Sequence, residues 1–409
     1  MSKVYIFFAF IFVLTSPITL VSGINYGLYL LFVIVTFLVF TSNRVKFQIP
    51  PTYLRLSLFL LFVIAINAVV TPYKPSIPLV LLGTGITCLP FFHYIISFNF
   101  KFSKKDVNTL IDRMILGSII LTAVCLLESL LNTVEDSSTG FIHSDIFAVG
   151  FVTSFCNQSV ALCLYRFKQT SEKKYLRCIG LFIIFIVLTI QLKAIAGCLL
   201  VLVGYYYYTH SHRGIYFRIG MIFLLLVTIL SFIPALNNKV EDYIYIYTTE
   251  GASESVARNA LYMTSGRIAV DYFPLGTGQG TFASVASRFS PDKVMVDYGI
   301  SNVFGLDEST QGAFLLDTHW ANILGENGIL GTLFYLALFF YPVNMMRKKK
   351  YSIIVPVELR FLTNLSILTI FIESFFLPLP NRLSFIFMYS GLMAILYRKQ
   401  IYYNNTTNE

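Results

Sequence analysis

The residues best suited to chemistry lie in the stretch DTHWANILGENGILG, residues 317–331. His319 can transfer a proton near neutral pH or stabilise a developing charge. Asn322 follows three residues later and Glu326 seven residues later, so a helix would place the three side chains on one face. A histidine at a membrane interface is often only an amphipathic anchor. The position of the motif in the chain has to decide between an anchor and a catalytic site.

Two further candidates are cations. Arg267 lies in TSGRIAVDYFPLGTGQGTF, and its guanidinium offers two parallel donors to the oxygens of a phosphate group. The alternative is an ion pair with Asp271, four residues on, along a solvated helix. Lys193 lies between two apolar runs in LTIQLKAIAG, where it is either a site cation or a lysine that snorkels at a helix end. Glu373, near the end of a late apolar run, is a candidate counter-ion for one of these cations.

The glycine-rich segment GTGQG, Gly276–Gly280, resembles a phosphate-binding loop only in part. No strand is expected before it, and no Lys-Ser or Lys-Thr pair follows it. Neither the dinucleotide-binding fingerprint nor the P-loop fingerprint is therefore met. The composition favours a tight turn that packs against the rest of the protein.

The composition indicates an integral membrane protein. Of the 409 residues, 56% are hydrophobic and 12% are charged, whereas an ordinary soluble domain has about 25% charged residues. The formal net charge of +9 does not indicate nucleic-acid binding, because the basic residues lie mostly in short loops between apolar runs. The six cysteines lie in or beside the apolar runs without metal-ligand spacing. We interpret them as small packing residues and expect no disulfide framework.

Apolar runs of about twenty residues predict an all-α fold with about twelve membrane-spanning helices. The predicted spans lie near residues 4–21, 25–41, 56–71, 76–98, 109–131, 144–165, 178–192, 195–209, 217–235, 318–342, 361–378 and 383–398. They divide the chain into an N-terminal part of about nine helices (1–235), a polar loop (236–317) and a C-terminal part of about three helices with a short tail (318–409). Within the loop, Ser253 or Ser255 can cap a helix over ESVARNALYMTSGRIAVDYF.

The distribution of Lys and Arg predicts the orientation in the membrane. Basic residues gather in alternate loops, which places both termini in the cytoplasm and the 236–317 loop outside it. The first apolar run resembles a signal peptide, but no clean small-x-small cleavage site stands out, so we expect a retained helix. A long ordered loop is usually functional.

Together these features resemble the superfamily of O-antigen polymerases and O-antigen ligases, which handle lipid-linked glycans at the periplasmic face of the bacterial inner membrane. Two segments carry the resemblance. SGRIAV…PLGTGQGTF lies in the long loop, and THWANILGENGILGTLFYL has a histidine followed after a short gap by Glu-x-Gly, two apolar residues and Gly. The plan of about twelve spans with one large late loop is also similar.

The resemblance implies a GT-C-like membrane fold and a metal-independent, inverting glycosyl transfer without a cofactor. The substrates would be a donor and an acceptor glycan on undecaprenyl diphosphate, with the lipid bilayer and a chain-length regulator protein as further partners. By motif, Arg267 would contact the donor diphosphate, and His319 would assist or orient the acceptor hydroxyl. Asn322 and Glu326 would complete the substrate site. Lys193 stands where ligase-like members have an arginine, and Arg258 is a candidate to replace that arginine.

Four interpretations stay open, and one of them is a non-catalytic membrane scaffold, which predicts that His319 and Arg267 can each be replaced by alanine without effect. A polymerase would join repeat units, a ligase would transfer the finished glycan to lipid A core or a protein, and a flippase or transporter would move the lipid-linked oligosaccharide. The lysine at position 193 and the glycine-rich loop favour a polymerase. A transporter should spread charged residues along several spans, whereas here they cluster at the outer ends of spans and in one loop.

Overall fold

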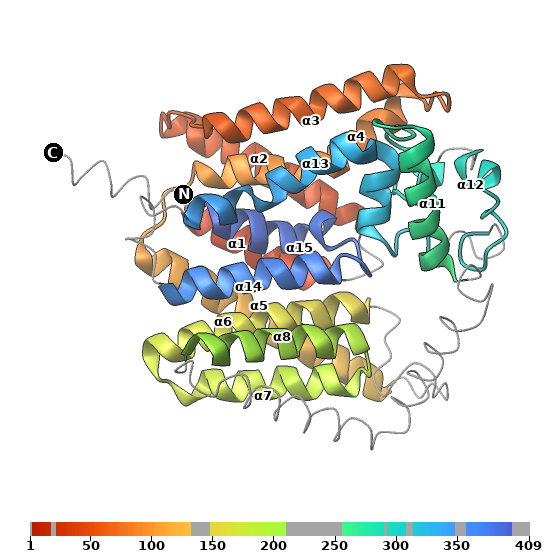
Figure 1. Ribbon diagram of the computed structural model, residues 1–409. Coiled ribbons are helices and arrows are strands. Elements are labelled where there is room, and N and C mark those ends of the chain that lie inside the picture. Colours follow the sequence, from red (N-terminus) through yellow and green to blue (C-terminus); the bar gives the residue numbers. More distant parts are fainter. Residues whose placement is uncertain are drawn as a thin grey trace. The chain divides into compact units, whose positions relative to one another are not determined.

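The computed structural model describes seven stretches of the chain (Figure 1), namely residues 2–17, 22–131, 148–209, 256–289, 293–307, 314–347 and 357–394. All regular secondary structure in these stretches is helical, as predicted. The chain divides into two compact units, each assembled from segments that are far apart in sequence. The first unit comprises residues 1–45, 100–245 and 353–373, and the second comprises residues 46–99, 246–352 and 374–409.

In the first unit, α6 is the central helix. It spans Val149–Thr170 and packs against α5 (Lys104–Leu131), α7 (Lys173–Leu188), α8 (Leu192–Thr209) and α14 (Val357–Glu373). α1 (Ser2–Thr15) packs on α5, and α2 (Ser22–Ser42) follows α1. Every residue of α6 from Phe151 to Tyr165 is buried. Polar side chains on α6 are therefore enclosed by protein on all sides.

In the second unit, α13 (His319–Arg347) is the central element. It packs against α3 (Pro51–Val70), α4 (Ile77–Phe98) and α11 (Ala257–Asp271). Shorter elements complete the unit: η2 (Ser287–Phe289), α12 (Lys293–Asp297), η5 (Leu379–Asn381), α15 (Leu383–Ile386) and the π-helical turn η6 (Phe387–Gly391). α11 and the loops after it bury a small core of their own, which includes Leu261, Ile268, Phe282 and Met295.

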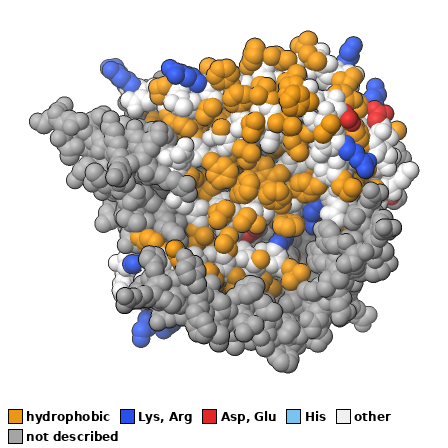
Figure 2. Space-filling view, in the orientation of Figure 1, with side chains coloured by type: hydrophobic (Ala, Val, Ile, Leu, Met, Phe, Trp, Pro, Cys, Tyr) orange, Lys and Arg blue, Asp and Glu red, His pale blue; other side chains and the backbone are white. Residues whose placement is uncertain are grey.

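Six helices in the described stretches are long and apolar enough to cross a membrane. These segments are Asn25–Ser42, Pro51–Val70, Ile77–Phe98, Lys105–Leu131, Leu192–Thr209 and His319–Asn344. On α3, the side chains of Leu58, Phe59, Phe62 and Val69 are between 55% and 82% exposed, which suits lipid and not water. Figure 2 shows hydrophobic side chains gathered over a broad area, with Lys and Arg mostly near its margins. The protein is therefore a membrane-embedded, all-α protein.

The predicted spans that lie within the described stretches overlap helices. The two predicted spans on either side of Gln191 are separate helices, because α7 ends at Leu188 and α8 begins at Leu192. The predicted span near 217–235 lies outside the described residues, so the total of about twelve spans remains a prediction. All six cysteines are free, in keeping with their interpretation as packing residues.

The polar loop predicted over 236–317 is partly helical within its described residues, since it contains α11 and α12. α11 begins at Ala257, and the preceding Val256 makes no side-chain hydrogen bond at the cap. Ser253 and Ser255, the predicted caps, lie outside the described residues. The side of the membrane on which this loop lies remains a prediction.

Candidate functional site

His319 is the first residue of α13 and is almost completely buried, with 1% of its surface exposed. Its Nε2 atom lies 3.0 Å from the Tyr335 hydroxyl, and its backbone N–H donates to the Ser374 carbonyl at 3.2 Å. The Trp320 and Tyr335 rings pack against the imidazole, with ring centres 5.0 and 5.5 Å away. The Nδ1 atom has no hydrogen-bond partner in the part of the chain that the structure describes. The Nε2 atom is therefore held in place, whereas the Nδ1 atom is a buried nitrogen that the described residues leave without a hydrogen bond.

The contact between His319 and Tyr335 requires α13 to fold back on itself. The two residues are 16 apart in sequence, which in a straight helix corresponds to roughly 24 Å along the axis. Gly328 has φ 62° and ψ −168°, values outside the helical region, and it breaks α13 into two segments (Figure 1). The span predicted near residues 318–342 is present but is interrupted at Gly328, because a glycine reaches a positive φ without steric cost.

The glycine-rich segment fills the break in α13. The Thr277 N–H donates to the Gly325 carbonyl at 2.9 Å, and the Gly278 N–H donates to the next carbonyl along α13 at 3.0 Å. These bonds satisfy carbonyls that the break would leave unpaired. Gly276 approaches so closely that a Cβ atom on it would lie 2.5 Å from the Gly325 oxygen and 2.5 Å from the Gly328 nitrogen. The segment is a packing turn, which is the interpretation that the sequence favours over a phosphate-binding loop.

The Asn322 and Glu326 side chains bind the same loop from the helix side. Glu326 is fully buried, and its Oε1 atom accepts hydrogen bonds from the N–H groups of Gly280 (2.9 Å) and Phe282 (3.1 Å). Asn322 is also buried, and its Nδ2 atom donates to the Phe282 carbonyl at 2.8 Å. His319, Asn322 and Glu326 all precede the break, so they share one helical segment. In this structure Asn322 and Glu326 hold the loop, and their role in substrate binding stays a prediction.

Two polar residues at the end of α3, Asn67 within the helix and Thr71 directly after it, also hold the loop, and sequence reasoning missed both. Asn67 Nδ2 donates to the Leu275 carbonyl and, at 2.7 Å, to the Glu326 carbonyl. The Thr71 hydroxyl donates to the Thr277 carbonyl. Both side chains are buried. The sequence did indicate that these residues have tertiary contacts, because a polar residue near the end of an apolar span needs a hydrogen-bond partner within the protein.

Arg258 lies beside the chain segment that leads into His319. Its Nη2 atom is 3.2 Å from Asp317 Oδ2, and its guanidinium carbon lies 5.4 Å from the centre of the Phe376 ring. The side chains of Arg258 and Asp317 are 28% and 32% exposed, so both can reach a ligand. Arg258 is therefore an arginine that the structure brings to the start of α13, although the sequence indicated only its proximity along the chain.

Arg267 lies on the exposed face of α11. Its guanidinium forms no hydrogen bond or ion pair with any residue that the structure describes. The Asp271 carboxylate accepts a hydrogen bond from the Tyr298 hydroxyl at 2.7 Å instead of pairing with Arg267. Burial, together with this carboxylate, raises the pKa of Tyr298, so its hydroxyl remains a proton donor. Arg267 is thus open to a ligand, and its contact with a diphosphate stays a prediction.

Lys193 lies in the first unit, near the start of α8, whereas the other five predicted residues lie in the second unit. Its positive charge acts on the carboxylate of Glu373 at the end of α14. Glu373 is buried, and its Oε1 atom accepts a hydrogen bond from Asn157 Nδ2 at 2.8 Å. A Cβ atom on Gly197 would lie 2.6 Å from the same Nδ2 atom, so the packing is tight. Glu373 therefore lies in a buried polar centre between α6, α8 and α14 and feels the charge of Lys193, and its role as a counter-ion stays a prediction.

Replacing Lys193 by methionine is expected to destabilise the first unit by about 0.5–3 kcal/mol, because it removes a positive charge that acts on the buried Glu373 carboxylate. The double variant Lys193→Met/Glu373→Gln removes both charges and should recover most of that loss. Thermal unfolding of the purified variants in detergent measures the difference. Equal losses in the single and double variants would contradict an interaction between the two residues.

The described residues include no group of three or more His, Cys, Asp or Glu side chains that could hold a metal ion. Comparison of the chain with protein-family models and with curated proteins gives no match. Function has to be argued from the residues around His319 and from the motifs that meet there.

Proposed function

We propose that the protein is a polysaccharide polymerase that joins undecaprenyl-diphosphate-linked oligosaccharide repeat units at the periplasmic face of the bacterial inner membrane. Three observations support this function. The protein is membrane-embedded, and the two segments that resemble O-antigen polymerases and ligases meet where Gly276 packs on Gly328. The observation that carries the proposal is His319, with one nitrogen bonded to Tyr335 and the other without a partner among the described residues.

The proposed reaction needs a base for the acceptor and cations for the leaving group. The acceptor hydroxyl attacks the anomeric carbon of the donor sugar, and the bond from that carbon to the diphosphate breaks with inversion. When Nε2–H donates to the Tyr335 oxygen, the Nδ1 atom of His319 keeps a lone pair that accepts the hydroxyl proton. The diphosphate leaves with the bonding electrons. Arg258, beside the segment that leads into His319, stabilises its added negative charge. The resemblance assigns the same role to Arg267.

Arg258→Ala is expected to lower the rate of chain synthesis at least about tenfold, because a charge-assisted contact with the leaving group is lost. Partly exposed ion pairs such as Arg258–Asp317 contribute only about 0–1 kcal/mol to the free energy of unfolding, so the fold should be retained. Arg258→Lys keeps the charge without the bidentate fork and should recover only part of the rate. Glycan chain-length profiles and unfolding in detergent measure the two effects, and unchanged chains in Arg258→Ala would contradict the role.

The proposed function includes the finer topology expected from the sequence. It consists of about twelve spans in a GT-C-like arrangement, cytoplasmic termini and a periplasmic 236–317 loop. In this orientation, donor and acceptor glycans reach His319 from the outer face of the membrane. A chain-length regulator protein would be a further partner.

Deletion of the gene in its native host tests the reaction class. A polymerase predicts that glycans with a single repeat unit persist on the final acceptor while long chains disappear. Long chains that accumulate on the lipid carrier would identify a ligase instead. Single repeat units retained on the cytoplasmic leaflet would identify a flippase. The wild-type gene should restore long chains.

A further inference from the structure

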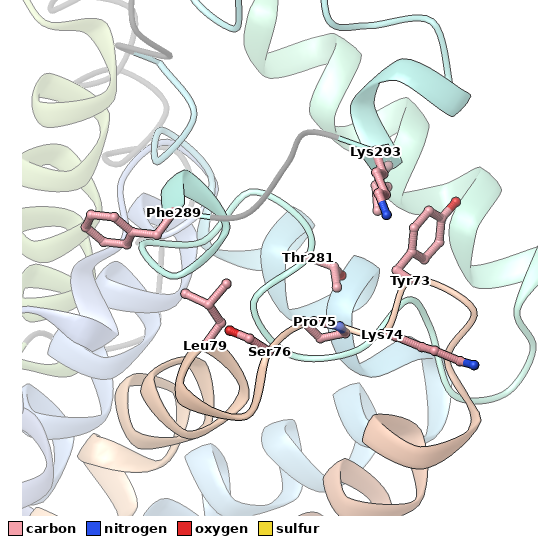
Figure 3. A pocket seen from close by; sticks show the side chains of 9 residues that line it. Tyr73, Lys74, Pro75, Ser76, Leu79, Thr281, Phe289 and Lys293 are labelled. Carbon is pink, nitrogen blue, oxygen red and sulfur yellow. The ribbon is translucent and has the colours of Figure 1, made fainter.

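A small cavity in the second unit adjoins the glycine-rich segment (Figure 3). It is formed by the turn between α3 and α4, the residues that follow Gly280, and α12. Its volume is about 210 Å³. At ~30 Å³ per water molecule, this is the space of about seven waters. The cavity can take one sugar ring and is too small for an oligosaccharide.

Two lysines give the cavity positive charge, and one carboxylate outside its lining, that of Asp297, interacts with the Tyr73 hydroxyl. In Figure 3 the Lys293 amine points toward Tyr73 and Thr281, whereas Lys74 extends outward from the rim. The described residues that line the cavity include no acidic side chain, and neither lysine forms a hydrogen bond or ion pair with a described residue. The N-terminus of α4, which has no acidic residue in its first turn, adds a partial positive charge. An anionic group is therefore the favoured occupant.

Tyr73 offers a flat platform for a sugar ring. Its hydroxyl lies 3.2 Å from the Tyr272 hydroxyl, and the two rings meet edge to face with their centres 5.9 Å apart. These contacts hold the Tyr73 ring in place before a ligand arrives, which lowers the entropy cost of binding. The C–H groups of a sugar pack well on an aromatic face. Ser76, whose hydroxyl does not cap α4, can hydrogen-bond to the sugar hydroxyls.

One wall of the cavity is held in shape by the candidate active site. The Gly280 N–H donates to the Glu326 carboxylate at 2.9 Å, and Thr281, the next residue, lines the cavity. Gly280 also packs so closely on α4 that a Cβ atom on it would lie 3.1 Å from the Leu79 carbonyl oxygen. The cavity is thus built on the loop that Glu326 holds, and Glu326 lies on the same helical segment as His319.

We propose that this cavity is a subsite for one acidic sugar residue of the glycan, which places its carboxylate on Lys293 and its ring on Tyr73. The assignment rests on the proposed glycan substrate. It narrows the substrate class to repeat units that contain a hexuronic acid or another carboxylate-bearing sugar.

Saturation-transfer-difference NMR on the purified full-length protein in nanodiscs tests the subsite. Methyl glucuronide and methyl glucoside are the probes, since they differ only at the carbon that carries the carboxylate. We expect signals from the glucuronide and signals about tenfold weaker from the glucoside, because a hydrogen bond to a charged group is lost. Lys293→Ala should weaken the glucuronide signal by a similar factor, and Lys293→Arg should retain it. Lys105→Ala, which removes an exposed lysine of the first unit, should leave the signal unchanged.

Several results would overturn the subsite. Equal signals from the two probes would mark a site for neutral sugars, and no signal from either probe would remove the subsite. Loss of the glucuronide signal on adding equimolar inorganic phosphate would identify a phosphate site. Its loss on replacing phosphatidylcholine by phosphatidylglycerol would identify a lipid headgroup site.

Sugar binding requires no catalysis, so the binding experiment tests the subsite independently of the polymerase function. Glucuronide binding by a protein that cannot polymerise would contradict the polymerase function and leave the acidic-sugar site standing. Polymerisation by a protein that binds no glucuronide would contradict the subsite alone.

Discussion

Replacing His319 by alanine is expected to abolish long glycan chains while the protein still inserts and folds. The substitution removes the nitrogen that accepts the acceptor proton, and loss of a general base lowers rates by roughly 10²–10⁴-fold. Gel profiles of the glycans from cells that carry the variant measure the effect, and immunoblots of the membranes measure the amount of protein. Wild-type chain lengths at a normal protein level would contradict the assignment of His319.

His93→Ala is the matched control for this substitution. His93 is as buried as His319 and lies in the same unit, where its ring centre is 4.2 Å from that of Phe387. Both substitutions remove a buried imidazole and therefore share the cost of an internal cavity. Only His319→Ala should stop chain synthesis. Equal losses in the two variants would show that the effect is structural.

Tyr335→Phe gives a graded form of the same test. It removes the hydroxyl that bonds His319 Nε2 and keeps the ring that packs against Trp320 and Phe91. Tyr335 acts through His319 as a positioning residue, and a hydrogen bond of about 1 kcal/mol corresponds to roughly a fivefold lower rate. The pH dependence of the rate should also change in Tyr335→Phe, because the Tyr335 hydroxyl sets which nitrogen of the His319 imidazole carries the proton. A lower rate with an unchanged pH profile would indicate a purely structural role.

The second large effect is expected from Gly276→Ala, which should detach the glycine-rich segment from α13. The new Cβ atom would lie 2.5 Å from backbone atoms of Gly325 and Gly328, and the φ of +77° is one that an L-residue rarely adopts. A left-handed conformation costs about 1–2 kcal/mol, and overpacking adds about 1–3 kcal/mol. We therefore expect the free energy of unfolding to fall by roughly 2–5 kcal/mol. Limited proteolysis should also cut the loop faster.

Gly266, within α11, provides the matched control for Gly276. No atom lies within 4 Å of the position that its Cβ atom would take. Alanine is about 1 kcal/mol more favourable than glycine inside a helix, so Gly266→Ala should leave stability unchanged or raise it. Thermal unfolding in detergent compares the two variants. Unfolding at the same temperature would mean that the close packing of Gly276 on α13 contributes nothing to stability.

The helices could be predicted from the sequence because a segment in lipid must satisfy its own backbone hydrogen bonds, which an isolated helix does. The shared segment of His319, Asn322 and Glu326 follows from their spacing of three and seven residues. The packing turn at Gly276–Gly280 follows from the absence of the residues that a phosphate-binding loop needs. Each of these features can be predicted from the periodicity of neighbouring residues or from the residue types that form turns.

The tertiary contacts of the candidate site could not be predicted in the same way. A glycine in an apolar run can either break the helix, as Gly328 does, or allow another helix to pack closely. The sequence alone does not show which of the two occurs. The contact of His319 with Tyr335 depends on that break, so no helical spacing indicates it. Arg258 and Arg267 lie on the same helix, and only the packing of α11 on α13 shows that Arg258 reaches the segment before His319.

Chain extension by the purified protein tests the central claim most directly. Wild-type protein and His319→Ala are reconstituted in liposomes with a single repeat unit on undecaprenyl diphosphate, and the products are separated by length. We predict that the wild-type protein releases undecaprenyl diphosphate and extends the glycan by whole repeat units, whereas His319→Ala leaves the substrate unchanged. Extension by His319→Ala at the wild-type rate would contradict a polymerase that works through His319.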